Sequence, residues 1–281
     1  MLDLSTLAAA ADALRAAERD RTPIPPLITT YPGIDVGDAY RIQLRNIERR
    51  LSGGGRVVGH KVGLSSKAMQ QMMGVDEPDY GHLLADMAHT EDVPVDTGRY
   101  LLPRVEPEVG FILGDDLPED CTEEQALAAT EAIAPALELI DSRIVDWKIA
   151  LPDTIADNAS SAGFVLGSTR LDPRSVDLTA LPVRMFRNDE EVGVGASSAV
   201  LGNPLVAVAW LARTVARFGV RLEAGHVVLP GSCTRAVDAR PGDVFRAEFG
   251  VLGAVQLAFQ PAADESQLRN VGQIPTQRGG V

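Results

Sequence analysis

Two glutamates separated by a single residue stand in the segment PRVEPEVGFIL, residues 103–113. Side chains of an extended strand alternate between its two faces, so Glu106 and Glu108 project from one face and the neighbouring apolar residues from the other. Two carboxylates side by side in a buried strand repel each other and lose hydration, and a divalent metal ion is the usual compensation. The alternative is an ordinary solvated strand face, because carboxylates mostly lie outside.

A third glutamate, Glu138, lies in the apolar segment 136–140, which reads as another buried strand. Three carboxylate oxygens fill half of the octahedral shell of Mg²⁺ or Mn²⁺ and leave the other half for water and substrate. Such a site suits a metal ion that works on a substrate through two oxygens. The alternative is a buried ion pair of Glu138 with Arg143 or Lys61.

A lysine and an aspartate provide candidates for proton transfer. Lys61 lies in the glycine-flanked segment GHKVGL, where glycine lets a ligand approach the backbone closely. We interpret Lys61 as a cation that binds a substrate carboxylate or enolate and takes part in proton transfer. A simpler interpretation is that it neutralises nearby buried carboxylates. Asp79 lies in the segment PDYG, whose composition is typical of a turn.

The elements that must position these residues follow from hydrophobic periodicity and capping residues. Predicted helices cover residues 5–19 and 37–51, a short methionine-rich segment capped by Ser65, and residues 122–134 and 204–218. Predicted strands cover residues 56–64, 103–113, 136–140, 185–187, 192–194, 227–229, 244–249 and 254–259. The segment 151–163 has the composition of a polar loop, and loops on rigid scaffolds often carry binding groups.

Composition and charge limit the function classes. The chain has 281 residues, 45% of them hydrophobic, and a net charge of −13, which argues against nucleic acid or an anionic membrane as a partner. Two cysteines make no disulfide framework, and no glycine-rich nucleotide motif is present. The N-terminal segment resembles neither a signal peptide nor a membrane span, so we expect a cytoplasmic protein.

Several long motifs, taken in order, resemble one enzyme family. They are GHKVGLSSKAMQQMMGVDEPDYGHL, PRVEPEVGFIL, PALELIDSRIVDWK, DTIADNASSAGFVLG and LPGSCTRAVDARPGD. Together they are similar to the 2-hydroxypenta-2,4-dienoate (2-oxopent-4-enoate) hydratases of the fumarylacetoacetate hydrolase superfamily. The resemblance implies an α+β fold, a mixed β-roll with flanking helices. It also implies an N-terminal helical cap segment over residues 1–55 and a catalytic domain over 56–261, while 262–281 read as a flexible tail.

The resemblance also assigns roles at matching positions. It implies that Mg²⁺ or Mn²⁺ is held by Glu106, Glu108 and Glu138. Lys61 and Asp79 match the family's strand lysine and its acidic residue in the P-D-[FY]-G motif, and we expect them to be catalytic. The small polar residues of the A-D-N-A-S motif correspond to Asn158 and Ser160, which we assign to substrate binding.

The implied reaction is metal-dependent hydration of 2-hydroxypenta-2,4-dienoate or 2-hydroxyhexa-2,4-dienoate to a 4-hydroxy-2-oxo acid, in a meta-cleavage pathway of aromatic or steroid breakdown. The alternative within the superfamily is a 2-oxo-3-hexenedioate (4-oxalocrotonate) decarboxylase, and outside enzymes a metal-dependent keto-acid binding protein. The resemblance further implies a homo-oligomer, with a downstream aldolase as a functional neighbour. The sequence leaves open the C5 substituent, the choice of ion and the division of work between Lys61 and Asp79.

Overall fold

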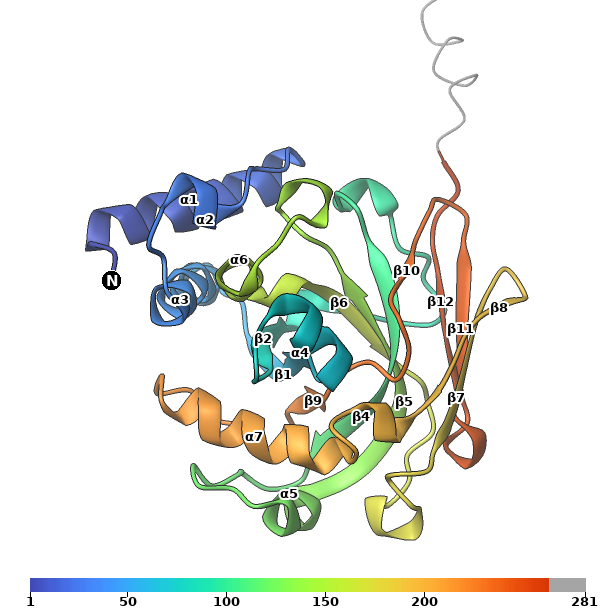
Figure 1. Ribbon diagram of the computed structural model, residues 1–281. Coiled ribbons are helices and arrows are strands. Elements are labelled where there is room, and N and C mark those ends of the chain that lie inside the picture. The colour runs from blue at the N-terminus through green and yellow to red at the C-terminus, as the bar shows by residue number, and fades with distance from the viewer. Residues whose placement is uncertain (263–281) are drawn as a thin grey trace, which may run out of the picture.

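The computed structural model describes residues 1–262, and a curled sheet of eight strands organises it (Figure 1). Seven strands follow the order β2-β1-β9-β4-β5-β6-β3, and β10 pairs with β4 beside this path. The sheet is mixed, because β1 pairs with β9 and β3 with β6 in parallel while its other pairs are antiparallel. Its strands are β1 (Val57–Gly63), β2 (Asp79–Leu84), β3 (Ala88–His89), β4 (Arg104–Leu113), β5 (Thr130–Ile140), β6 (Ser161–Leu166), β9 (Val227–Leu229) and β10 (Val237–Asp238).

A second sheet of four antiparallel strands lies against β5 and β6, at the right of Figure 1. Its order is β12-β11-β7-β8, and the predicted hairpin around Asn188 and Asp189 joins β7 to β8. Both turn residues have positive φ, 52° and 66°, as a tight hairpin turn requires. The strands are β7 (Pro182–Arg187), β8 (Glu190–Ala196), β11 (Val244–Glu248) and β12 (Ala254–Ala258).

Three N-terminal helices cover one side of the large sheet (Figure 1): α1 (Leu4–Asp20), α2 (Leu27–Thr30) and α3 (Val36–Ser52). Asp3 caps α1, and a capping box of Asp35 and Asp38 begins α3. Gln43 of α3 donates to the carbonyls of Tyr80 and Ile155, at 2.9 and 2.8 Å, which ties the helix to the sheet. The division into a cap over residues 1–55 and a catalytic domain over 56–261 stays a prediction.

The remaining helices are short, apart from α7, and lie at the ends of strands. They are α4 (Lys67–Met73), α5 (Glu123–Ala129), α6 (Leu151–Ala156) and α7 (Pro204–Ala216). Single 3₁₀ turns are η1 (Ala85–Met87), η2 (Thr97–Arg99), η3 (Val145–Trp147), η4 (Asn158–Ser160), η5 (Pro173–Ser175), η6 (Ser197–Ala199) and η7 (Gly250–Leu252). In the part of the chain that the structure describes, no helix combines the length and apolar character needed to cross a bilayer.

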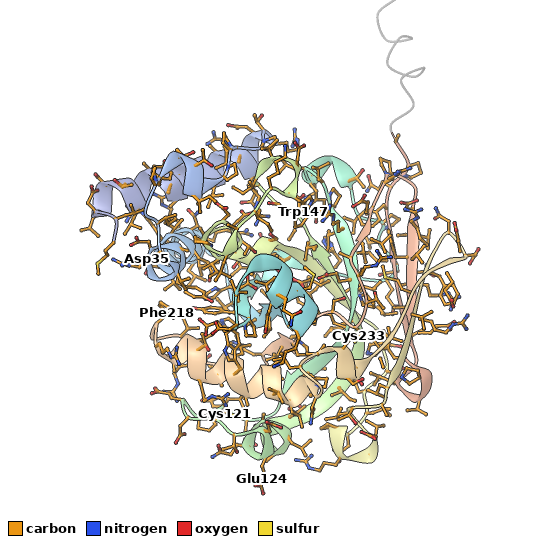
Figure 2. All side chains as sticks on the ribbon, in the orientation of Figure 1. Asp35, Cys121, Glu124, Trp147, Phe218 and Cys233 are labelled. Atoms are coloured by element: carbon orange, nitrogen blue, oxygen red, sulfur yellow. The ribbon has the colours of Figure 1, made fainter. Side chains whose placement is uncertain are left out.

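Apolar side chains form two clusters. The larger one joins the N-terminal helices, α7, the outer face of the large sheet and the small sheet. The smaller one fills one end of the inner face of the roll and includes Leu83, Phe164 and Leu229. The free cysteines Cys121 and Cys233 are both buried and lie apart in the fold (Figure 2). The predicted α+β fold, a mixed β-roll with flanking helices, is therefore confirmed.

Some predicted boundaries are wrong. The capping box of Thr122 and Gln125 begins α5 as expected, but the helix ends at Ala129 rather than Ala134. Residues 130–134 instead begin β5, because β4 offers them a long antiparallel partner whose pairing outweighs their helix propensity. Ser66, not Ser65, caps α4, and α7 ends two residues before Phe218. The predicted tail, apart from residue 262, lies outside the described residues.

Candidate functional site

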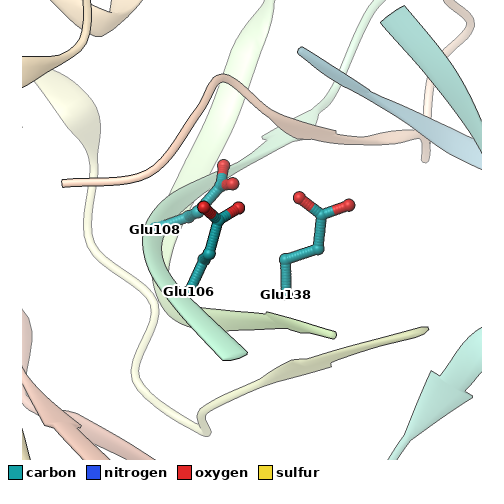
Figure 3. A group of neighbouring side chains, drawn as sticks. All are labelled: Glu106, Glu108 and Glu138. Atoms are coloured by element: carbon teal, nitrogen blue, oxygen red, sulfur yellow. The ribbon is translucent and has the colours of Figure 1, made fainter. Parts of the chain in front are cut away.

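Three glutamate side chains converge on the inner face of the roll (Figure 3). Glu106 and Glu108 come from β4, and Glu138 of β5 lies directly opposite Glu106 in the antiparallel register. One oxygen from each carboxylate lies within 4.8 Å of the others. Within residues 1–262 this is the one cluster of acidic, histidine or cysteine side chains with metal-binding geometry.

The burial of these carboxylates tests whether a metal ion fits. Glu108 and Glu138 are 0% exposed, and Oε1 of Glu108 and both oxygens of Glu138 have no hydrogen-bond partner among the described residues. Burial and the nearby Glu138 raise the pKa of Glu106 to about 7, and burial raises the pKa of both other carboxyls. Buried carboxylate oxygens without partners are costly, and a hard divalent cation with oxygen ligands removes that cost. The residues present therefore fit a divalent metal ion.

The backbone amide of Gly231 holds one of the three carboxylates in place. It donates a 2.7 Å hydrogen bond to Oε2 of Glu108. Gly231 has φ +127°, and a Cβ there would lie 1.7 Å from Oγ of Ser65, so glycine is required on both counts. Gly231 thus belongs to the site, although it was not predicted from the sequence.

Lys61 of β1 lies beside the cluster. Its Nζ donates to the carbonyl of Ala159 at 2.9 Å and lies 3.4 Å from Oε2 of Glu138, an ion pair without hydrogen-bond geometry. Burial alone would lower the pKa of Lys61, but the surrounding carboxylates, Glu138 and Asp79 foremost, outweigh it and raise the pKa to about 12. Lys61 is therefore an ammonium ion at neutral pH, and one of its three N–H groups donates to Ala159. Arg143 pairs with Asp157 instead of Glu138.

Asp79 is the first residue of β2 and not part of a turn, because it pairs with Gly63 of β1. The hydroxyl of Thr154 donates to its Oδ2 at 3.1 Å, while Oδ1 is buried and has no partner among the described residues. A Cβ on Gly63 would lie 2.2 Å from Oδ1 of Asp79 and 3.4 Å from Nζ of Lys61, so this glycine makes room for both groups. Burial raises the pKa of Asp79, and Lys61 opposes that rise.

The segment 151–163 was predicted to be a polar loop, but it forms α6, the turn η4 and the start of β6. In η4, Asn158, Ala159 and Ser160 all have positive φ, at 56°, 49° and 56°. Left-handed backbone costs a residue with a Cβ about 1–2 kcal/mol. Three such residues in succession persist only where the surroundings enforce them.

The side chain of Asn158 is part of what enforces this turn. Its amide accepts from the backbone N–H of His82 at 2.8 Å and donates to the carbonyl of the same residue at 3.0 Å. The turn comes so near β2 that a Cβ on Gly81 would lie 2.3 Å from the carbonyl oxygen of Asn158. This contact places the Ala159 carbonyl against Lys61. Ser160 is buried, and its Oγ has no partner among the described residues.

Replacing Asn158 with alanine is expected to lower kcat about 10- to 100-fold, because the turn that positions Lys61 loosens. Leaving two buried backbone groups of His82 unpaired should also lower the free energy of unfolding by about 1–3 kcal/mol. Steady-state kinetics and urea unfolding measure the two effects. Asn158→Gly is the control for backbone strain, since glycine adopts positive φ freely. It also lacks both hydrogen bonds to His82, so it should be destabilised less than Asn158→Ala but lose as much kcat. A rise in KM with kcat unchanged would contradict this and support substrate contact.

The carboxylate cluster should make stability depend on pH. The pKa of Glu106 is raised from about 4.3 to about 7, so the folded protein binds more protons than the unfolded chain between these values. The metal-free protein should therefore lose stability as the pH rises from 5 to 8. Mg²⁺ needs ionised ligands, so it should raise the thermal midpoint more at pH 8 than at pH 5.

Calorimetry of the wild type and of Glu106→Gln/Glu108→Gln, with and without Mg²⁺, checks this pH dependence. The double variant should show almost no response to Mg²⁺ at either pH, whereas the exposed control Glu190→Gln should behave as the wild type. An equal Mg²⁺ effect at pH 5 and pH 8 would contradict a metal site built from these carboxyls.

This chain is similar over most of its length to proteins named as hydratases. It is 46% identical over 252 residues to the 2-keto-4-pentenoate hydratase of Paraburkholderia xenovorans (strain LB400), covering 89% of this chain and 94% of that one. It is 40% identical over 268 residues to the 2-oxo-hept-4-ene-1,7-dioate hydratase of Escherichia coli, covering 92% and 100%.

A solved structure has the same fold. The 4-oxalocrotonate decarboxylase from Pseudomonas putida G7, complexed with magnesium and adipate, superimposes with a TM-score of 0.89 at 34% identity, covering 92% of this chain and 99% of that one. The family model described as fumarylacetoacetate (FAA) hydrolase C-terminal matches residues 63–260, which include every residue of the site except Lys61. The curled sheet is thus a family architecture, and this chain belongs to the fumarylacetoacetate hydrolase family.

Proposed function

We propose that this protein is a metal-dependent hydratase that converts 2-hydroxypenta-2,4-dienoate, or its hexadienoate homologue, into a 4-hydroxy-2-oxo acid. The observation that carries the proposal is the buried group of three glutamates with an ammonium ion 3.4 Å from one of them. Such a site accumulates positive charge where an enolate forms. The similarity of nearly the whole chain to enzymes named hydratases supports the same conclusion.

Glu106, Glu108 and Glu138 would hold the ion, and their oxygen ligands suit Mg²⁺ and Mn²⁺ equally. When bound, the ion supplies Lewis-acid stabilisation of negative charge on substrate oxygens. We propose that Ser160, whose buried hydroxyl has no partner among the described residues, contacts the substrate, and that Asn158 positions the turn around it.

Lys61 and Asp79 carry opposite charges when ionised, and we assign them different roles in the reaction. Lys61 keeps its ammonium proton, so it stabilises negative charge on the C2 oxygen when the dienol loses its proton. Asp79 has a free, buried Oδ1 and a raised pKa, so it can accept the C2 hydroxyl proton and return a proton at C5. Water then adds at C4, and protonation at C3 completes a product that is one water heavier than the substrate.

A decarboxylase remains the second candidate, because the magnesium-bound decarboxylase from Pseudomonas putida G7 shares the fold at 34% identity. Decarboxylation uses the same enolate stabilisation, with loss of CO₂ in place of water addition. The two reactions differ in product mass, and this decides between them.

The test is the ultraviolet absorbance of freshly generated 2-hydroxypenta-2,4-dienoate with the protein and Mg²⁺, followed by mass analysis of the product. We expect metal-dependent loss of the dienol band, a product one water heavier, and no turnover by Glu108→Gln. Turnover of 2-oxo-3-hexenedioate with release of CO₂, and none of the dienoate, would favour the decarboxylase. Bound metal with no turnover of either would leave a keto-acid binding protein.

Three further expectations complete the proposal: a homo-oligomer, a cytoplasmic location, and an aldolase that consumes the 4-hydroxy-2-oxo acid. The last follows from chemistry, since a 4-hydroxy-2-oxo acid is the product of an aldol addition and cleaves by its reversal. Sedimentation velocity of the metal-loaded protein measures the oligomeric state.

A further inference from the structure

The inner face of the roll is more exposed toward one end of β4 than toward the other. Along β4, residues 104, 106, 108, 110 and 112 share this face. At the Gly110 end it is filled: a Cβ on Gly110 would lie 3.0 Å from Leu166, and the smaller apolar cluster continues beyond it. Exposure rises in the other direction, from Glu108 at 0% through partly exposed Glu106 to Arg104 at 34%. A substrate whose oxo-acid end lies at the carboxylates therefore extends toward Arg104.

Two contacts hold Arg104 at this more exposed end, and a third holds the tryptophan on which it stacks. Its Nε donates to Oδ1 of Asp238, the residue opposite it on β10, at 2.9 Å. Its guanidinium lies over the ring of Trp147, 4.4 Å from the centroid, and the indole N–H of Trp147 donates to the carbonyl of Leu102 at 3.1 Å. Asp146 and Trp147, which is labelled in Figure 2, both have φ 55°, an unfavourable backbone conformation for residues with a Cβ.

This arrangement leaves the terminal nitrogens of Arg104 accessible. Stacking on an aromatic face occupies the plane of a guanidinium but not its N–H edges. Neither Nη has a hydrogen-bond partner among the described residues, and Asp238, whose side chain is 70% exposed, engages Nε alone. A guanidinium with a free fork edge binds carboxylates in bidentate fashion. The Cα atom of Arg104 lies about 7 Å along the strand from that of Glu106, two residues away.

We propose that Arg104 is a specificity-determining residue that binds a second carboxylate at the far end of the substrate, so that the site accepts 2-oxo-4-enoates that are dicarboxylates. This inference rests on the proposed function, because it takes the oxo-acid end to lie at the glutamates. Trp147 and Asp238 are positioning residues for the guanidinium. The neighbouring acidic charge of Asp238 limits the preference, since it competes for the same cation.

The kinetic test compares kcat/KM for 2-oxo-hept-4-ene-1,7-dioate with kcat/KM for 2-oxopent-4-enoate. The wild type should turn over both, and Arg104→Met should lower the ratio about 10- to 100-fold, the effect of losing a charge-assisted hydrogen bond. The ratio for Arg104→Lys should lie between those of the wild type and Arg104→Met, because lysine keeps the positive charge but not the two parallel N–H donors. Asp238→Asn, an exposed substitution, should raise the ratio. A ratio that no variant changes, or a wild type that rejects the dicarboxylate while hydrating the shorter substrate, overturns the proposal.

A binding measurement separates failure of this inference from failure of the proposed function. Calorimetric titration of the Mg²⁺-loaded protein with adipate and with hexanoate should show tighter binding of adipate to the wild type and loss of that preference in Arg104→Met. The preference for adipate is expected even if the protein hydrates neither enoate. That result would contradict the proposed reaction but support the second carboxylate site at Arg104. Equal binding of adipate and hexanoate by the wild type overturns the subsite.

Discussion

Replacing Lys61 with methionine is expected to lower kcat about 10²- to 10³-fold, the usual cost of removing one preorganised donor from a developing oxyanion. Methionine keeps much of the buried volume of lysine but neither its charge nor its hydrogen bond to the carbonyl of Ala159. Because Lys61 acts on charge that develops during the reaction, KM should change much less than kcat. Stopped-flow absorbance of the dienol band at saturating Mg²⁺ measures both constants.

The controls for Lys61 separate charge from structure. Lys61→Arg keeps the positive charge and should retain more activity than Lys61→Met, although its planar fork cannot reproduce the contact with Ala159. Removing the ammonium also removes the cation that opposes the raised pKa of Asp79, so the acid limb of the rate profile should move to higher pH in Lys61→Met. If the pH–rate profile of Lys61→Met does not move and its kcat stays within threefold of the wild-type value, Lys61 merely neutralises Glu138.

The grouping of the three glutamates could be predicted because it is local along one strand or follows from one strand pairing. Period-two alternation places Glu106 and Glu108 on one face of β4 with no knowledge of the fold. Glu138 stood out as a lone charge in an apolar strand, and the β4–β5 register then set it opposite Glu106. Of the two alternative ion-pair partners, Arg143 and Lys61, the structure shows Lys61, at 3.4 Å. This pair is compatible with metal binding because a carboxylate has two oxygens.

The supporting residues could not be predicted, because they reach the site from segments far apart in the sequence. Thr154 donates to Asp79 across 75 positions, and the amide of Gly231 to Glu108 across 123. Gly231 is one of many glycines in loops, and its positive φ and its closeness to Ser65 are visible only in the structure. Asn158 shows the opposite problem: its sequence motif was informative, but its amide faces the backbone of His82 rather than an open site.

Backbone conformation is the other part that sequence patterns did not show. PDYG is typical of a turn, yet Asp79 begins β2 because β1 is available as an antiparallel partner. The change matters for function: in a strand, Asp79 projects into the buried site opposite Gly63 and not into solvent. Likewise no residue in DNAS requires positive φ, and the left-handed turn exists because β2 and Lys61 hold it.

Replacing Asp79 with asparagine is expected to lower kcat about 10²- to 10⁴-fold, the range for a group that transfers protons in the transition state. Asparagine is nearly isosteric and can still accept from the hydroxyl of Thr154, so the fold and metal affinity should be preserved. Thr154→Val is the matched control: it removes that hydroxyl and keeps the carboxylate, and we expect a loss of tenfold or less, about the worth of one hydrogen bond.

Isotope exchange tells whether Asp79 moves the protons. In D₂O the wild type should place deuterium at C5 and at C3 of the product, while Asp79→Asn should lose the C5 exchange in proportion to kcat, because return of a proton at C5 is the step assigned to its free Oδ1. Undiminished exchange at C5 with slow hydration would mean that Asp79 instead orients the water that adds at C4. The raised pKa of Asp79 argues for proton transfer, since a carboxyl shifted toward neutral pH both gains and loses a proton more readily at working pH than an ordinary aspartate.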